Sequence, residues 1–117
     1  MSYAPVKTVL DNIIAVWTAG NGAPPDFPTA HKSPFAWDTA ANLLASSARG
    51  LPMIQPAIIG KAGLGATANI VVALTTGVGG FPRMPFGGLD SNTQTFLDPK
   101  GPEIATIITW IEGGCQP

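Results

Sequence analysis

The chain of 117 residues has the length of one domain, and only 11% of its residues are charged, with a net charge of -1. Proteins carry about 25% charged residues on average, so we expect a surface that is poor in charge, as in proteins that meet a partner or an apolar ligand. The basic residues are scattered along the sequence. This argues against nucleic-acid binding, which needs clustered Lys and Arg to neutralise phosphates.

The sequence also predicts a soluble protein without a membrane span. No apolar run reaches the roughly 20 residues that cross a bilayer. The first residues lack the order of a secretory signal, in which basic residues precede an apolar run and a small-residue cleavage site. We therefore expect a cytoplasmic protein or the mature form of an exported one.

The apolar residues recur with helical spacing in a set of segments separated by stretches rich in Gly and Pro. The first helix is expected over residues 6–17. A second is expected over 33–50, with Ser33 as the N-cap. The third covers 67–76, and the fourth runs from 102 to 112 before two glycines. The pattern predicts a single all-α domain over residues 1–117, with long loops at 20–28 and 77–100.

Each helix has an apolar face that needs a partner. The first and fourth helices have the strongest apolar stripes, so we expect them to pack across each other. The residues expected at this crossing are Leu10, Ile13, Ile14, Ile107, Ile108 and Ile111. The second helix is expected to turn Trp37, Ala40, Ala41 and Leu44 inward, and the third Ile70, Val71 and Leu74.

The stretch FPRMPFGG at residues 81–88, followed by a helix that ends in WIEGG, resembles the C-terminal half of small bacterial c-type cytochromes. The resemblance covers residues 70–115, and more loosely 6–19. In that family the loop methionine is an axial ligand of the haem iron, and the last helix crosses the first. The resemblance therefore implies a cytochrome c-like fold, with Met84 as a haem ligand and Trp110 in the core.

The covalent haem attachment of that family is excluded for this chain. It requires a Cys-x-x-Cys-His motif after the first helix. Here the corresponding region reads VWTAGNGAPP, and Cys115 is the single cysteine of the chain. Trp17 stands where the resemblance would place the first attachment cysteine.

The histidine and the loop methionine leave two interpretations open. In one, His31 and Met84 hold a haem non-covalently for electron transfer, because His with Met is a known haem ligand pair. In the other, His31 forms hydrogen bonds in its loop and Met84 fills an irregular gap in the core. Arg83, beside Met84, is expected to point to solvent or to bind loop carbonyls.

If no haem is bound, the haem space must be filled by side chains or by another ligand, because a large void is costly. We expect aromatic residues and the loop methionine to close this space and to line a pocket for a small apolar ligand. The predicted pocket residues are Trp17, His31, Trp37, Phe81, Met84 and Phe86.

Enzymatic patterns are weaker. A catalytic role would pair His31 with Asp26 or Asp38, but the spacing matches no specific motif, so we assign no catalytic residue and no metal site. The run at 63–68 has the form Gly-x-Gly-x-x-Ala of a dinucleotide-binding turn. Prolines in the preceding segment do not suit a central parallel strand, and we interpret the run as a turn that leads into the third helix.

These observations favour a non-catalytic binding or interaction module. We expect the apolar loop around Phe81 and Phe86, with parts of 20–28, to form a contact surface in a homo-oligomer or with a larger protein. The alternative is a monomer in which these aromatic residues fold inward.

Overall fold

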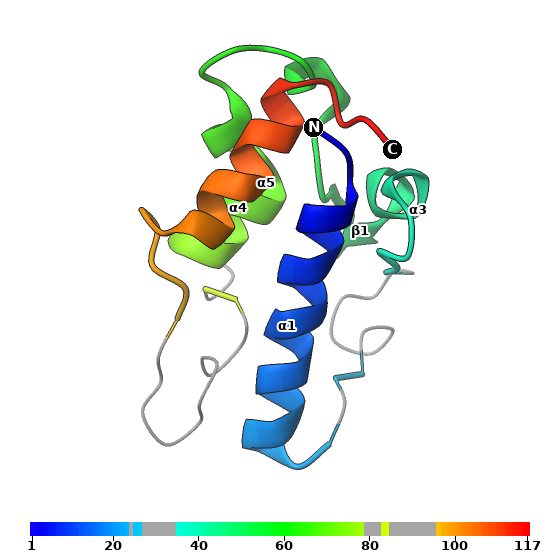
Figure 1. The fold of residues 1–117 in the computed structure, drawn as a ribbon. Coiled ribbons are helices and arrows are strands. Elements are labelled where there is room, and N and C mark those ends of the chain that lie inside the picture. Colours follow the sequence, from blue (N-terminus) through cyan, green and yellow to red (C-terminus); the bar gives the residue numbers. More distant parts are fainter. Residues whose placement is uncertain (24, 27–34, 79–82, 85–95) are drawn as a thin grey trace.

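The computed structural model describes residues 1–23, 25–26, 35–78, 83–84 and 96–117. These residues form a mostly helical structure with one small hairpin (Figure 1). The Cα radius of gyration is 13.3 Å, close to the value of about 13 Å for a compact chain of this length. In chain order the elements are α1 (Ala4–Asn21), α3 (Ala40–Ala45), β1 (Ser47–Ala48), β2 (Leu51–Pro52), the 3-10 helices η1 (Pro56–Ile58) and η2 (Gly65–Thr67), α4 (Asn69–Thr75) and α5 (Pro102–Glu112).

Helix α1 is longer than the predicted segment at both ends. It starts with a proline at its first turn, where the missing N–H costs no hydrogen bond. It ends at Gly22, which has a φ of 78° and donates its N–H to the Thr18 carbonyl at 2.9 Å. This left-handed cap is a common helix end that glycine adopts without strain. The buried residues of α1 are Val6, Leu10 and Ile13.

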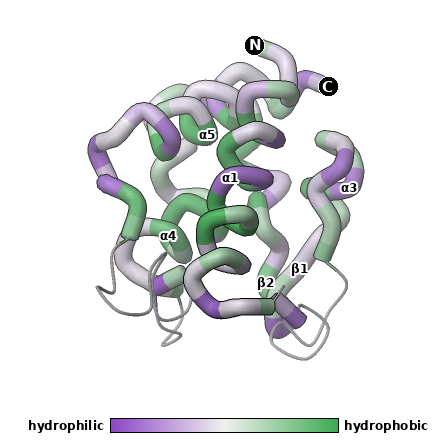
Figure 2. The backbone as a smooth tube through the Cα atoms, turned by 60° about the horizontal axis from the view of Figure 1, so that its bottom comes forward, coloured by the Kyte–Doolittle hydropathy of each residue, from purple (hydrophilic) through white to green (hydrophobic). Residues whose placement is uncertain are grey.

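Helix α5 lies beside α1 and packs on it, as predicted (Figure 1). Its buried residues are Ile104, Ile107, Trp110 and Ile111. Of the residues expected at this crossing, Ile14 and Ile108 are only half-buried. The Cγ2 methyl of Ile108 lies near Gly65 of η2. In Figure 2 the hydrophobic parts of α1, α4 and α5 gather in the middle of the molecule.

The predicted second helix over 33–50 is wrong in most of its length. Of this range, residues 33 and 34 lie outside the described residues, 35–39 are not helical, and α3 covers only Ala40–Ala45. Thr39 is the actual N-cap, and its side chain accepts a hydrogen bond from the backbone N–H of Asn42 at 3.1 Å. Polar side chains at helix ends satisfy backbone groups in this way and set where the helix starts.

The end of α3 and the following hairpin replace the rest of that predicted helix. The buried Ser46 hydroxyl accepts from the backbone N–H of Ala36 at 2.9 Å and lies 2.8 Å from the Ala36 carbonyl oxygen. β1 and β2 then pair antiparallel around Arg49 and Gly50, whose φ values are 51° and 83°. Two consecutive residues with positive φ form the tight turn that fits the strand twist. Of the residues predicted to face inward, Ala40 is buried, Trp37 and Leu44 are half-buried and Ala41 is exposed.

Helix α4 confirms the third predicted helix, with Ile70, Val71 and Leu74 buried. It packs against α5 and η2. The segment 63–68 is the predicted turn into this helix, and it contains η2. The Gly65 N–H donates to the Oε2 atom of Glu112 at 3.1 Å. This amide therefore already has a hydrogen-bond partner within the chain. No described helix is long and apolar enough to cross a membrane.

Candidate functional site

Three of the predicted pocket residues are described, and their contacts are with different parts of the fold. Trp17 is half-buried near the end of α1. Trp37 and Met84 are partly buried and pack against the hydrophobic core. His31, Phe81 and Phe86 lie outside the described residues, so the predicted pocket and the His31–Met84 pair stay predictions.

Trp37 is fixed to the N-terminal half of α1. Its Nε1–H donates to Asp11 Oδ1 at 2.8 Å, and its carbonyl oxygen accepts from the Tyr3 hydroxyl at 2.6 Å. Asp11 also accepts from Lys7 Nζ at 2.7 Å. The hydrogen bonds from Lys7 and Trp37 lower the pKa of the Asp11 carboxyl. These contacts place Trp37 beside Asp11, and Trp17 is about 9 Å further along the helix axis.

Met84 and Arg83 are attached to the C-terminal half of α4. The Met84 N–H donates to the Ala73 carbonyl at 2.7 Å. The Arg83 Nε–H donates to the Leu74 carbonyl at 3.0 Å, and its guanidinium also donates to the Leu97 carbonyl and lies 4.6 Å from the centre of the Phe96 ring. Arg83 was expected either to point to solvent or to bind loop carbonyls, and in the structure its side chain binds carbonyls. It thereby connects α4 to the segment before α5.

The pairing of His31 with Asp26 or Asp38 stays a prediction, because His31 lies outside the described residues. Asp26 and Asp38 themselves are exposed. Among the described residues, no group of three or more His, Cys, Asp or Glu side chains is placed to hold a metal ion.

Cys115 is buried, which the sequence did not indicate. Its exposed fraction is 5%, and its N–H donates to the Trp110 carbonyl at 3.0 Å. Burial raises the pKa of the thiol from 9.0 to about 11. Burial is also the main reason why the pKa of Tyr3 rises to about 12, with smaller effects from the charges of Asp11 and Asp38.

These raised pKa values predict that stability falls at alkaline pH. Above pH 9 the unfolded state loses the Cys115 proton first, so the free energy of unfolding decreases until the folded thiol ionises near pH 11. Tyr3 adds a further decrease in the free energy of unfolding, which starts near pH 10 and ends near pH 12. Urea unfolding between pH 8 and pH 11 measures this effect. Over this range the free energy of unfolding of the wild type should fall by up to about 2 kcal/mol more than that of Cys115→Ala. Equal losses in both proteins would contradict a buried, neutral thiol.

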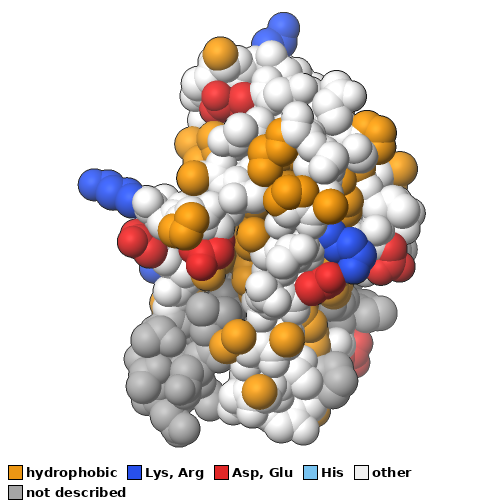
Figure 3. Space-filling view, in the orientation of Figure 1, with side chains coloured by type: hydrophobic (Ala, Val, Ile, Leu, Met, Phe, Trp, Pro, Cys, Tyr) orange, Lys and Arg blue, Asp and Glu red, His pale blue; other side chains and the backbone are white. Residues whose placement is uncertain are grey.

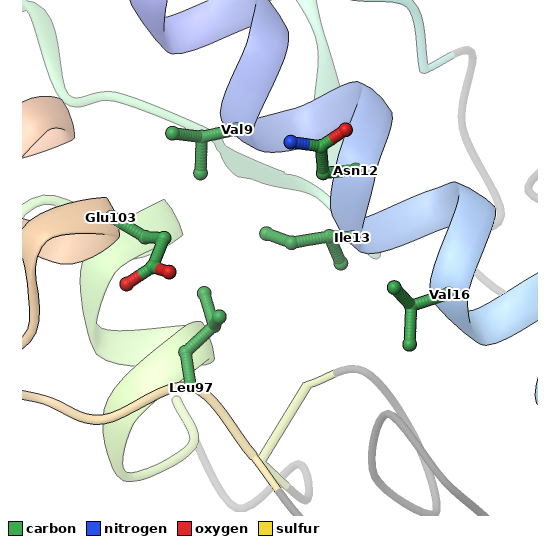
Figure 4. Close-up of a pocket in the computed structure, with 6 residues that line it drawn as sticks. All are labelled: Val9, Asn12, Ile13, Val16, Leu97 and Glu103. Carbon is green, nitrogen blue, oxygen red and sulfur yellow. The ribbon is translucent and has the colours of Figure 1, made fainter.

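A groove lies between α1 and the beginning of α5, at a position that the sequence analysis did not predict (Figure 4). Its cavity volume is about 210 Å³. Trp17, Trp37 and Met84 do not line it. The lining residues are Val9, Asn12, Ile13 and Val16 of α1, Leu97 of the preceding segment and Glu103 of α5.

Among its described lining residues, the groove has apolar walls and one charged group. In Figure 4, Val9, Ile13 and Leu97 point toward the space between the helices, and the Glu103 carboxylate faces the same space. Glu103 is in the first turn of α5, where a negative charge is favoured by the helix dipole. Val16 is 49% exposed at the outer end. The sequence contained some indication of the α1 side of the groove, because the spacing of Val9 and Val16 places them on the same face of a helix.

The size of the groove limits what it can hold. An engineered apolar cavity of about 150 Å³ binds benzene, whereas pockets for drug-sized ligands measure about 300–1,000 Å³. A volume of about 210 Å³ therefore suits a group of the size of a benzyl ring. In the orientation of Figure 1, apolar groups are spread among polar surface, with acidic and basic side chains between them (Figure 3).

Comparison with models of protein families, with curated proteins and with solved structures finds no match for this chain.

Proposed function

We propose that the chain is a non-catalytic binding module on a cytochrome c-like helical framework without covalent haem. The packing of α1 on α5 supports this framework, and the absence of a Cys-x-x-Cys-His motif removes covalent haem chemistry. Its binding site is the groove between these two helices. The observation that carries the proposal is the apolar groove with the Glu103 carboxylate at its wall.

A non-catalytic role fits the chemistry of the groove. Val9, Ile13, Val16 and Leu97 provide apolar contact area, and none of the described lining side chains is a nucleophile paired with a base. A small apolar ligand that fills the groove would gain about 25 cal/mol for each Å² of apolar surface removed from water. Non-covalent haem binding by His31 and Met84, with electron transfer, is the alternative, because His with Met is a known haem ligand pair. No contact of the described residues favours it over the core-filling role of Met84.

The groove is expected to bind benzyl alcohol weakly, with a dissociation constant on the order of 1 mM for a ligand this small. The measurement is a titration of the ¹⁵N- and ¹³C-labelled protein followed by the methyl signals of the groove. Signals of Val9, Ile13, Val16 and Leu97 should shift together along one binding curve. Shifts confined to other parts of the chain, or none at 20 mM, would contradict the proposal.

A blocking variant with a matched control locates the site. In Val16→Trp the large ring at the rim should cover the groove and weaken binding about fivefold or more. Ala15→Trp adds the same ring at the neighbouring exposed position, which does not line the groove, and should bind like the wild type. Equal affinity of both variants would place the site elsewhere.

A further inference from the structure

We infer that the groove selects small organic cations, in which an ammonium group is attached within one or two carbons of a benzyl-sized apolar body. This inference rests on the proposed function, because it names the ligand class of the same groove. It is derived from the position and surroundings of Glu103 among the lining residues.

The Glu103 carboxylate has no cationic partner among the described residues. Lys7 pairs with Asp11 at 2.7 Å, and Arg83 donates to the carbonyl oxygens of Leu74 and Leu97. Glu103 itself is half-buried. Part of the carboxylate lies close to the buried Gly101, with Oε2 3.2 Å from the position that a Cβ atom would take there. A half-buried carboxylate that faces apolar groups interacts more strongly with a cation than a fully solvated one does.

The other walls require the cation to carry an apolar body. Val9 and Ile13 of α1 lie opposite Leu97, and Glu103 is at one side of the same space (Figure 4). A simple hydrated ion would leave these apolar groups without contacts. A neutral hydrocarbon would fill the space but leave the carboxylate next to an apolar surface, where it loses hydration. A ligand that has an ammonium group and an apolar body can pair with the carboxylate and also contact the apolar side chains.

The test compares benzylammonium with benzyl alcohol, which is nearly the same size and is neutral. Binding is followed by the methyl signals of Val9, Ile13, Val16 and Leu97 at low ionic strength. Benzylammonium should bind about 3- to 5-fold more tightly, the upper part of the gain of one partly exposed charge pair. This ratio should fall below about twofold in Glu103→Gln.

The matched control is Glu112→Gln, which removes the same charge from the same helix. Glu112 does not line the groove, and glutamine keeps an oxygen that can accept the Gly65 N–H. It should retain the preference for benzylammonium. Added NaCl at 0.5 M should reduce the preference in the wild type, because salt screens charges. This measurement needs no variant and holds even if Glu103→Gln does not fold.

The outcomes separate the inference from the proposed function. Binding of benzyl alcohol in the groove reports on the proposed function, and the ratio between the two compounds reports on the inference. Equal binding of both compounds, or a preference that survives in Glu103→Gln, overturns the inference alone. Binding of N-acetyl-lysine methylamide without binding of benzylammonium also overturns it and would favour a lysine of a partner protein. If neither benzyl compound shifts the groove signals, both proposals fail.

Discussion

Replacing Trp110 by Ala is expected to lower the free energy of unfolding by about 3–5 kcal/mol, the usual cost of truncating a buried aromatic residue. Trp110 has an exposed fraction of 0%. Its ring is 5.1 Å from the Tyr3 ring, and its Nε1–H donates to the Gln116 carbonyl at 2.7 Å. The side chain therefore joins the beginning of the chain, α5 and the C-terminal segment, and its loss leaves a cavity among all three.

Urea denaturation measures this decrease in the free energy of unfolding, and two further variants serve as comparisons. Trp110→Phe keeps most of the apolar area and should lose less than Trp110→Ala. Trp17→Ala removes the same side chain from a half-buried position and should also cost less, because less area returns to water. A loss below about 1 kcal/mol for Trp110→Ala would mean that this residue is not at the centre of the core.

Replacing Gly65 by Ala is expected to lower the free energy of unfolding by about 1–3 kcal/mol through overpacking. A Cβ atom at this position would lie 2.9 Å from Cγ and Oε2 of Glu112 and 2.9 Å from Cγ2 of Ile108. These distances are shorter than ordinary contacts between carbon atoms. The side chains of Glu112 and Ile108 would have to shift, and the hydrogen bond from the Gly65 N–H to Glu112 would be disturbed.

A double-mutant cycle tests the steric explanation. Truncation of Ile108 to Ala removes one of the atoms that the new methyl group would meet. Gly65→Ala should therefore cost less in the Ile108→Ala background than in the wild type, by at least about 0.5 kcal/mol. Additive losses would show that the alanine does not press on Ile108.

Local signals in the sequence were sufficient to predict the helices that build the core. In α4 and α5 the apolar residues recur at helical spacing, and Pro102 marks the start of α5. The packing of α1 on α5 was also predictable, since the two longest apolar stripes each require a partner. The stripe did not indicate that Ile14 and Ile108 would be only half-buried, because a stripe shows which residues share a face but not which neighbour each one meets.

The beginning of α3 was mispredicted because a proline after a serine at 33–34 resembled a helix start, whereas the chain uses Thr39. The contact between Ser46 and Ala36 that accompanies this arrangement is tertiary. It depends on how 35–37 folds back toward the end of α3, which no local pattern specifies.

By itself the sequence determined a mostly helical chain, the places of α1, α4 and α5, and the exclusion of covalent haem attachment. These follow from residue spacing and from the presence or absence of reactive groups, which are local properties. Only the tertiary structure decided that Cys115 is buried, that Glu112 binds the Gly65 amide, and that Leu97 and Glu103 meet the α1 face to form the groove. The last two join residues that are far apart in the chain, and the burial of all these groups exists only once the helices pack.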